Sequence, residues 1–92
     1  MRLVKVTWID SFGVGVNWQP LSNASDIEHT CVSVGYLAKD GRHVKVIVPH
    51  YSPANTDIDA EEQGCGDMAI PCGAIIEMID LIESPKEFAD AT

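Results

Sequence analysis

Alternation of apolar and polar residues identifies the first secondary-structure element of this chain. In residues 2–9, Val4, Val6 and Trp8 alternate with polar side chains, a period of two that is typical of a half-buried strand. The same alternation returns twice between residues 30 and 49. The three runs predict an antiparallel β-sheet as the framework of the fold.

A tight turn joins the second and third runs, residues 30–38 and 43–49. Asp40-Gly41 lies between them, and this dipeptide favours the positive φ values of a two-residue hairpin turn. The sequence therefore predicts a β-hairpin, with a bulge or bend at Gly35, which has no side chain to pack in a flat sheet. Alternate positions share one face of each strand: Val32, Val34 and Tyr36, then Val44, Val46 and Val48.

Two long segments lack a periodic pattern and are predicted to be loops. Residues 10–30 are rich in Gly, Ser, Asn and Asp, and Ser22 or Ser25 is placed to cap one short helical turn. Residues 50–66 are acidic and rich in turn-forming residues. Loops this long in a small domain are usually functional or partly ordered, so both are candidates for a binding role.

The stretch GCGDMAIPCGAII, residues 64–76, predicts a corner between two short strands. Pro71 cannot donate a ladder hydrogen bond, so it separates a strand at 67–70 from another at about 74–79. The β-branched isoleucines of the second favour a strand over the alternative, a helix over 74–83. Gly64, Gly66, Pro71 and Gly73 permit the turns, and Met68, Ile70, Ile75 and Ile76 are expected to fill the core.

Five short strands with a glycine-marked bend predict an all-β fold, a small and strongly bent antiparallel five-stranded barrel. Residues 1–83 are expected to form this single domain, and residues 84–92 a polar C-terminal tail. The hairpin CVSVGYLAKDGRHVKVIV and the corner AIPCGAIIEM resemble the two parts of the Sm-fold signature. The resemblance implies an Sm- or SH3-like small barrel. Pro71 and Cys72 stand where Sm proteins carry an RNA-binding basic residue, so the resemblance extends to architecture only.

A second resemblance concerns the order of short motifs along the chain. W-[ILV]-D near the start, S-V-G-[YWF]-L in the middle and I-P-x-x-x-I near the end resemble small uncharacterised proteins encoded by bacteriophages. The resemblance covers most of the chain, and none of its motifs is catalytic. It implies an accessory protein that acts on a factor of the host.

Composition fits one soluble domain. The chain has 92 residues, 46% of them hydrophobic and 22% charged, which is ordinary for a globular fold. No apolar run is long enough to cross a bilayer, and the first residues lack the apolar core of a signal peptide, so we expect a cytoplasmic protein. The three cysteines, an odd number, are expected to be reduced thiols: Cys31, Cys65 and Cys72.

Charge is divided unevenly along the chain. Residues 1–50 carry a net +1 and residues 51–92 a net −9. Because Lys and Arg contacts to phosphates supply most nonspecific nucleic-acid affinity, this balance disfavours nucleic-acid binding. An acidic half instead suggests a basic protein partner, or serves solubility alone.

No constellation with known chemistry is found in the sequence. Phosphate-binding, dinucleotide, nucleophile-elbow and HExxH motifs are absent. Cys65 has acidic neighbours, which disfavour the thiolate that a nucleophile needs. The histidines and cysteines lack the paired C-x2-C spacing of structural zinc, although His29-x-Cys31 would place two ligands on one strand face. The sequence thus predicts no catalytic residues, no metal and no cofactor.

The remaining candidates are aromatic and charged residues in the two loops. Trp18 is expected to fold back over the open end of the barrel; in the alternative it is an exposed anchor, the type of residue that dominates binding hot spots. We expect a non-enzymatic protein that forms homo-oligomers and binds and inhibits a host protein. The residues assigned to that partner are Phe12, Trp18, Tyr51, Asp57, Asp59, Glu61 and Glu62.

Two other functions stay open at this point. The first is an oligomeric protein that sequesters a small molecule or nucleotide, since phosphorylated ligands require cations. The second is a structural component of the virion. The cationic set that would serve a ligand consists of Arg2, Lys39, Arg42, His43 and Lys45.

Overall fold

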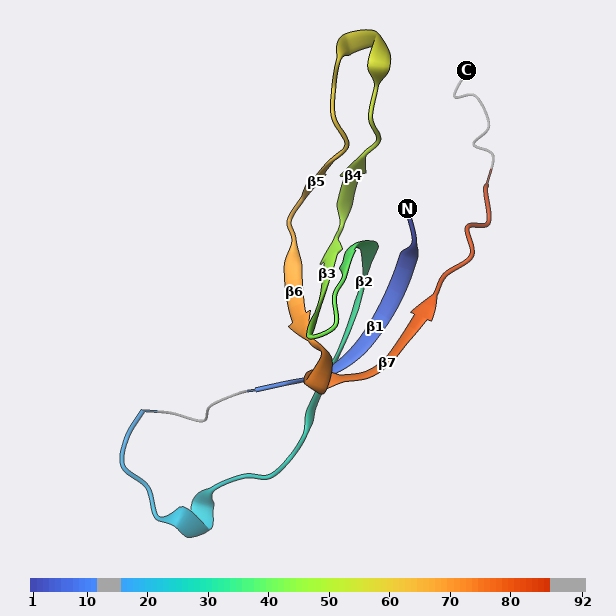
Figure 1. The fold of residues 1–92 in the computed structure, drawn as a ribbon. Helices are drawn as coiled ribbons and strands as arrows, with labels where there is room; N and C mark the ends of the chain where they lie inside the picture. The colour runs from blue at the N-terminus through green and yellow to red at the C-terminus, as the bar shows by residue number, and fades with distance from the viewer. Residues whose placement is uncertain (12–15, 87–92) are drawn as a thin grey trace, which may run out of the picture.

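The structure is a computed structural model that describes residues 1–11 and 16–86. Within these residues the fold is mainly β, with antiparallel pairing throughout (Figure 1). The strands are β1 (Leu3–Asp10), β2 (His29–Asp40), β3 (Val44–Val48), β4 (His50–Ser52), β5 (Gln63–Cys65), β6 (Met68–Pro71) and β7 (Ile75–Asp80). Three short 3-10 turns join them: η1 (Leu21–Asn23), η2 (Thr56–Ile58) and η3 (Cys72–Ala74).

Five of the strands form one sheet in the order β6-β3-β2-β1-β7. The predicted hairpin is confirmed as β2 and β3, which pair through Asp40 and Lys45. The predicted two-residue turn at Asp40-Gly41 is wrong, because Asp40 is still part of β2 and neither residue has a positive φ. The two strands around the corner are also confirmed, and residues 75–80 form a strand rather than a helix. The polar tail is described only as far as Lys86, and residues 84–86 are exposed and outside any helix or strand.

The small core draws on both ends of the sheet. Val4, Val6, Leu37, Ile47 and Ile70 form one buried cluster. Trp8, Met68, Ile75 and Met78 are partly buried against it, so the predicted core positions are correct apart from Ile76, which is 56% exposed. The register between β1 and β7 shifts between Thr7 and Trp8. Ile76 lies at this irregularity of β7 and is therefore turned outward.

The predicted closed barrel is not found among the described residues. β6 and β7 lie at opposite ends of the strand order and do not pair with each other. Residues 50–66, expected to be a loop, contain a second, two-stranded sheet of β4 and β5. The period-2 pattern could not reveal these strands because each is three residues long and largely exposed.

Two glycines of the fold occupy sterically special positions. A Cβ on Gly35 would lie 2.9 Å from the backbone oxygen of Val48, so β3 approaches this position closely. The bulge expected at Gly35 lies instead between Leu37 and Lys39, and the register of β2 with β1 is unbroken at Gly35. Gly66 has a φ of 78°, which an L side chain rarely adopts. The exit from the second loop therefore depends on glycine, as the sequence predicted for the corner.

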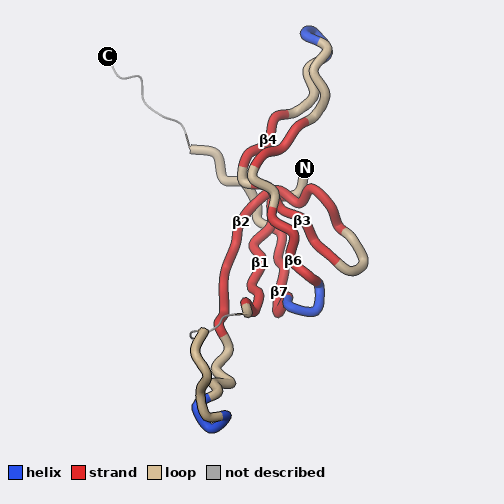
Figure 2. Tube along the Cα trace, turned by 90° about the vertical axis from the view of Figure 1, so that its left-hand side faces the viewer, coloured by secondary structure: helices blue, strands red, loops and turns tan. Residues whose placement is uncertain are grey.

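The chain is much more extended than a compact monomer. Its radius of gyration is 18.9 Å, against about 12 Å for a compact domain of this length. Its accessible surface is 7769 Å², whereas a compact 10.0 kDa protein exposes about 5,200 Å². Figures 1 and 2 show the reason, since two long segments leave the sheet at opposite ends.

Candidate functional site

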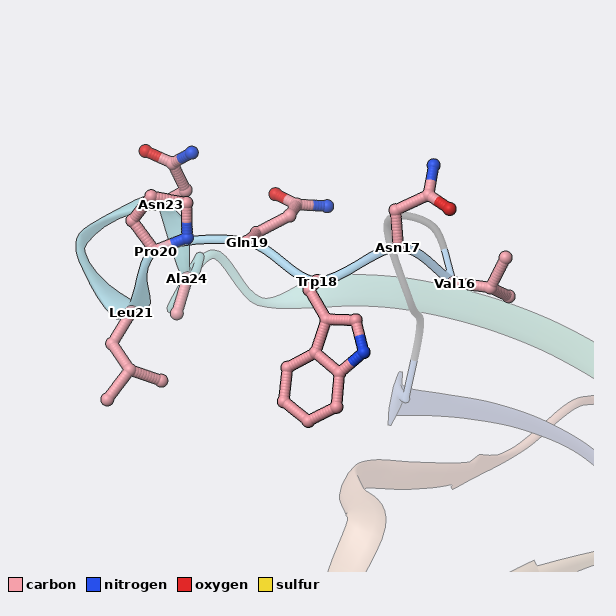
Figure 3. A pocket seen from close by; sticks show the side chains of 8 residues that line it. All are labelled: Val16, Asn17, Trp18, Gln19, Pro20, Leu21, Asn23 and Ala24. Carbon is pink, nitrogen blue, oxygen red and sulfur yellow. The ribbon is translucent and has the colours of Figure 1, made fainter.

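The first projecting segment, here called arm 1, comprises residues 16–28 and joins the region of β1 to β2. Its backbone curls at η1, which follows Pro20 and has no side-chain cap. The predicted serine cap is therefore wrong, and the Ser25 hydroxyl instead accepts a hydrogen bond from the Ile27 amide. A hollow of about 400 Å³ lies within the curl and is lined by residues between Val16 and Ala24 (Figure 3).

Arm 1 presents large apolar side chains to solvent. Trp18 is fully exposed, at 103%, and Leu21 is 91% exposed. The expectation that Trp18 folds back over the sheet is therefore wrong, and the indole extends away from the arm's backbone in Figure 3. Phe12, which was assigned to the same surface, lies outside the described residues. Isolated exposed apolar residues are normal, whereas arm 1 exposes four on one short segment: Val16, Trp18, Leu21 and Ile27.

The second projecting segment, arm 2, comprises residues 49–67 and carries the acidic group. Asp57, Asp59, Glu61 and Glu62 are all exposed on it. Near its tip the Asn55 side chain accepts a hydrogen bond from the Asp57 amide at 3.0 Å. The tip is further closed by a bridge between Asn55 and Ala60. The acidic residues are thus displayed by an ordered hairpin rather than by an irregular loop.

Tyr51 supports the base of arm 2. Its ring lies 5.3 Å from that of Tyr36 on β2, at an angle of 39°, and its hydroxyl donates a hydrogen bond to the Glu62 carboxylate. This hydrogen bond raises the pKa of Tyr51 above its usual value of 10.0, and burial of the phenol adds a smaller increase. Because Tyr51 is half-buried in these contacts, its ring is less available to a partner than that of Trp18.

The six described residues assigned to a protein partner do not form one surface. Arm 1 and arm 2 extend from opposite ends of the sheet in both views (Figures 1 and 2). Trp18 therefore lies on one arm and the acidic side chains on the other. A single partner molecule that contacts both must be large, or must meet arms from different copies of the chain.

The cationic residues gather near the end of the β2–β3 hairpin, but two of them are already paired. Arg2 contacts Asp40 at 3.2 Å and Asp80 at 2.9 Å, and Lys45 forms an ion pair with Asp40. The ion pair with Lys45 lowers the pKa of Asp40 below its usual value of 3.8, and Arg2 adds a smaller decrease. Lys39, Arg42 and His43 are exposed around the same turn. The ion pairs of Arg2 and Lys45 connect the ends of neighbouring strands. Their positive charges are therefore less available to a phosphate.

The valines of β2 lie on the outer face of the sheet, which the alternation of residues alone does not reveal. Val32 is 61% exposed and Val34 52%, because the inner face of β2 instead carries Cys31, Ser33 and Gly35. On the inner face, the Trp8 indole donates a hydrogen bond to the Ser33 hydroxyl at 3.0 Å. Small inward residues leave room for the tryptophan, so hydrophobicity alone points to the wrong face.

Three cysteines are present as free thiols. The Cys72 thiol donates a hydrogen bond to the Gly41 carbonyl at 3.7 Å, and Cys65 is exposed on β5. Cys31 is different, because its sulfur lies close to the side chains of Asp10 and His29. The ligand atoms of these three residues are all within 4.8 Å of one another.

No family model matches the chain, and comparisons with curated proteins and with solved structures give no match. Among the described residues, no helix is long and apolar enough to cross a membrane.

Proposed function

We propose that this chain is a non-enzymatic accessory protein of the bacteriophage type that binds a host protein and inhibits it. The observation that carries the proposal is the complete exposure of Trp18 on arm 1, with Leu21 beside it. Tryptophan is enriched among the few residues that supply most of the affinity of protein interfaces. Because the sequence contains no catalytic motif, the proposed inhibition results from binding alone and involves no chemical reaction on the partner.

Arm 2 favours a basic partner. Its five exposed carboxylates belong to the half of the chain with a net charge of −9: Asp57, Asp59, Glu61, Glu62 and Asp67. Charges at the rim of an interface accelerate encounter and fix orientation more than they add affinity. Arm 1 accordingly supplies the apolar anchor, and arm 2 steers the partner.

Self-association also belongs to the proposal. The chain exposes 7769 Å² of the roughly 14,500 Å² that an unfolded chain of its mass exposes. It thus buries less than half of that surface, whereas even a 60-residue domain buries about 60%. The surface in excess of a compact monomer, about 2,500 Å², is ample for a standard interface of about 1,600 Å². Val32 and Val34 on the outer face are the apolar residues offered to a second copy.

The sheet itself fits an Sm- or SH3-like small barrel that has not closed. Its two end strands contribute Ile70 and Met78 to one cluster. Five strands in a flat sheet would hold its edges about 19 Å apart, so one cluster requires strong curvature. The close approach of β3 to Gly35 supports the same architecture. The proposed location is the cytoplasm of the host cell.

A ligand-sequestering function is less well supported, because Arg2 and Lys45 already have carboxylate partners. A virion component remains the third proposal, and it predicts that the chain co-purifies with particles.

Affinity capture from host lysate at low salt, with matched variants, tests the proposed function. Trp18→Ala removes the anchor, and Ile82→Ala removes another side chain that is 94% exposed but lies outside arm 1. We expect one host protein to be captured equally by the wild type and Ile82→Ala, and at least tenfold less by Trp18→Ala, as for a hot spot of about 2 kcal/mol. No capture by the folded wild type, or equal capture by Trp18→Ala, would contradict the proposal. Sedimentation of the wild type at the monomer mass would contradict the homo-oligomer.

A further inference from the structure

The end of the sheet from which arm 1 leaves brings three metal-binding side chains together. Asp10 is the last residue of β1 and His29 the first of β2, and the two are direct partners in the antiparallel register. Cys31 lies two residues further along β2, where it pairs with Trp8. Since side chains alternate along strands, Asp10, His29 and Cys31 share the inner face. The three side chains are therefore neighbours because of the strand register, and their proximity does not depend on one particular set of rotamers.

We propose that Asp10, His29 and Cys31 bind a zinc ion at the base of arm 1. A carboxylate, an imidazole and a thiolate are the three ligand types that zinc uses in proteins, at about 2.0–2.3 Å. The ligand atoms already lie within 4.8 Å of one another, so small side-chain rotations bring them to one ion. Sulfur and nitrogen ligands disfavour calcium and magnesium, which take oxygen.

The burial of the three ligands fits an ion that is reached from solvent. His29 is exposed, whereas Asp10 and Cys31 are half-buried. Three protein ligands leave one of four tetrahedral positions for water or for a side chain of another molecule. Trp8 is the cross-strand partner of Cys31 and is partly buried against the core.

The ion would join the two strand ends that bracket arm 1. Residues 29–31 begin β2 and pair with the end of β1, and strand ends fray easily. Binding of zinc to the folded state alone stabilises that state by mass action. The site goes beyond the proposed partner binding and does not depend on it, because it is tested by metal binding directly.

Titration of the reduced full-length chain with zinc and with cobalt(II) tests the site. We expect one equivalent of metal to bind, and the cobalt complex to show a thiolate-to-cobalt charge-transfer band in the near ultraviolet. Cys31→Ser should abolish the band, and Asp10→Asn and His29→Ala should each weaken zinc binding at least tenfold. Cys65→Ser is the matched control, because Cys65 is exposed and faces a histidine, His50, across β4 and β5. It should bind as the wild type does.

Thermal unfolding separates loss of the site from loss of the fold. Zinc in hundredfold excess over its dissociation constant should raise the wild-type midpoint by roughly 10 °C or more, and should leave that of Cys31→Ser unchanged. Without zinc the two proteins should unfold at similar temperatures. Less than one bound equivalent, a band that persists in Cys31→Ser, or a band lost in Cys65→Ser would overturn the proposal.

Discussion

Replacement of Gly35 by alanine tests the close approach between β2 and β3. The new methyl group would lie 2.9 Å from the Val48 oxygen, 3.2 Å from the Val48 carbonyl carbon and 3.3 Å from the Ile47 Cβ. Two of these atoms are backbone, so β3 must move. Overpacking of this kind lowers the free energy of unfolding by about 1–3 kcal/mol. Alanine also reduces the conformational entropy of the unfolded chain, which offsets about 0.4–1 kcal/mol of that loss. We expect a net loss of about 1–2 kcal/mol.

Thermal unfolding followed by circular dichroism measures this loss. For a domain of this size, the expected change lowers the midpoint by roughly 5–15 °C. Gly73→Ala is the matched control, because a Cβ there meets no atom within 4 Å, and its midpoint should equal or slightly exceed that of the wild type. If both variants unfold at the wild-type temperature, β3 does not lie over Gly35 and the proposed curvature of the sheet is wrong.

Three further predictions concern stability. Trp18→Ala should leave the unfolding free energy within about 0.5 kcal/mol of the wild type, because the side chain buries nothing; a large loss by chemical denaturation would mean that the indole packs on the chain. Ile70→Ala, at a side chain 1% exposed, should cost about 2–5 kcal/mol, and Ile76→Ala should cost well under half as much in the same assay. The pKa of Asp40 is lowered in the folded state, so its ion pairs stabilise the fold above pH 3.8 and are lost as the pH falls through the lowered value. The difference in unfolding midpoint between wild type and Asp40→Asn should therefore shrink below pH 4, and a difference that grows there would contradict the assignment.

Local signals in the sequence were enough to predict the hairpin and the corner. Asp40-Gly41 locates the connection between the strands, although not its turn type, and Pro71 marks the end of a strand because its ring restricts the backbone. The orientation of β2 was not predictable in this way. Its inner face carries Cys31 and Ser33 while its valines are exposed, so the more hydrophobic face is the outer one.

Longer-range features were also beyond the sequence. The zinc ligands Asp10 and His29 are far apart in the chain, and only the strand register makes them neighbours. The hairpin in arm 2 consists of three-residue strands, too short for a recognisable alternation. The exposure of Trp18 depends on the direction in which arm 1 leaves the sheet, and residue types do not encode that direction locally.

Site-specific photo-crosslinking detects whether a protein partner is held at Trp18. A photoreactive phenylalanine derivative in place of Trp18, with Ile82 as the matched control position, is irradiated in host lysate. We expect a defined adduct with one host protein from position 18 and none from position 82. Adducts with copies of the chain alone, or the same adducts from both positions, would contradict it.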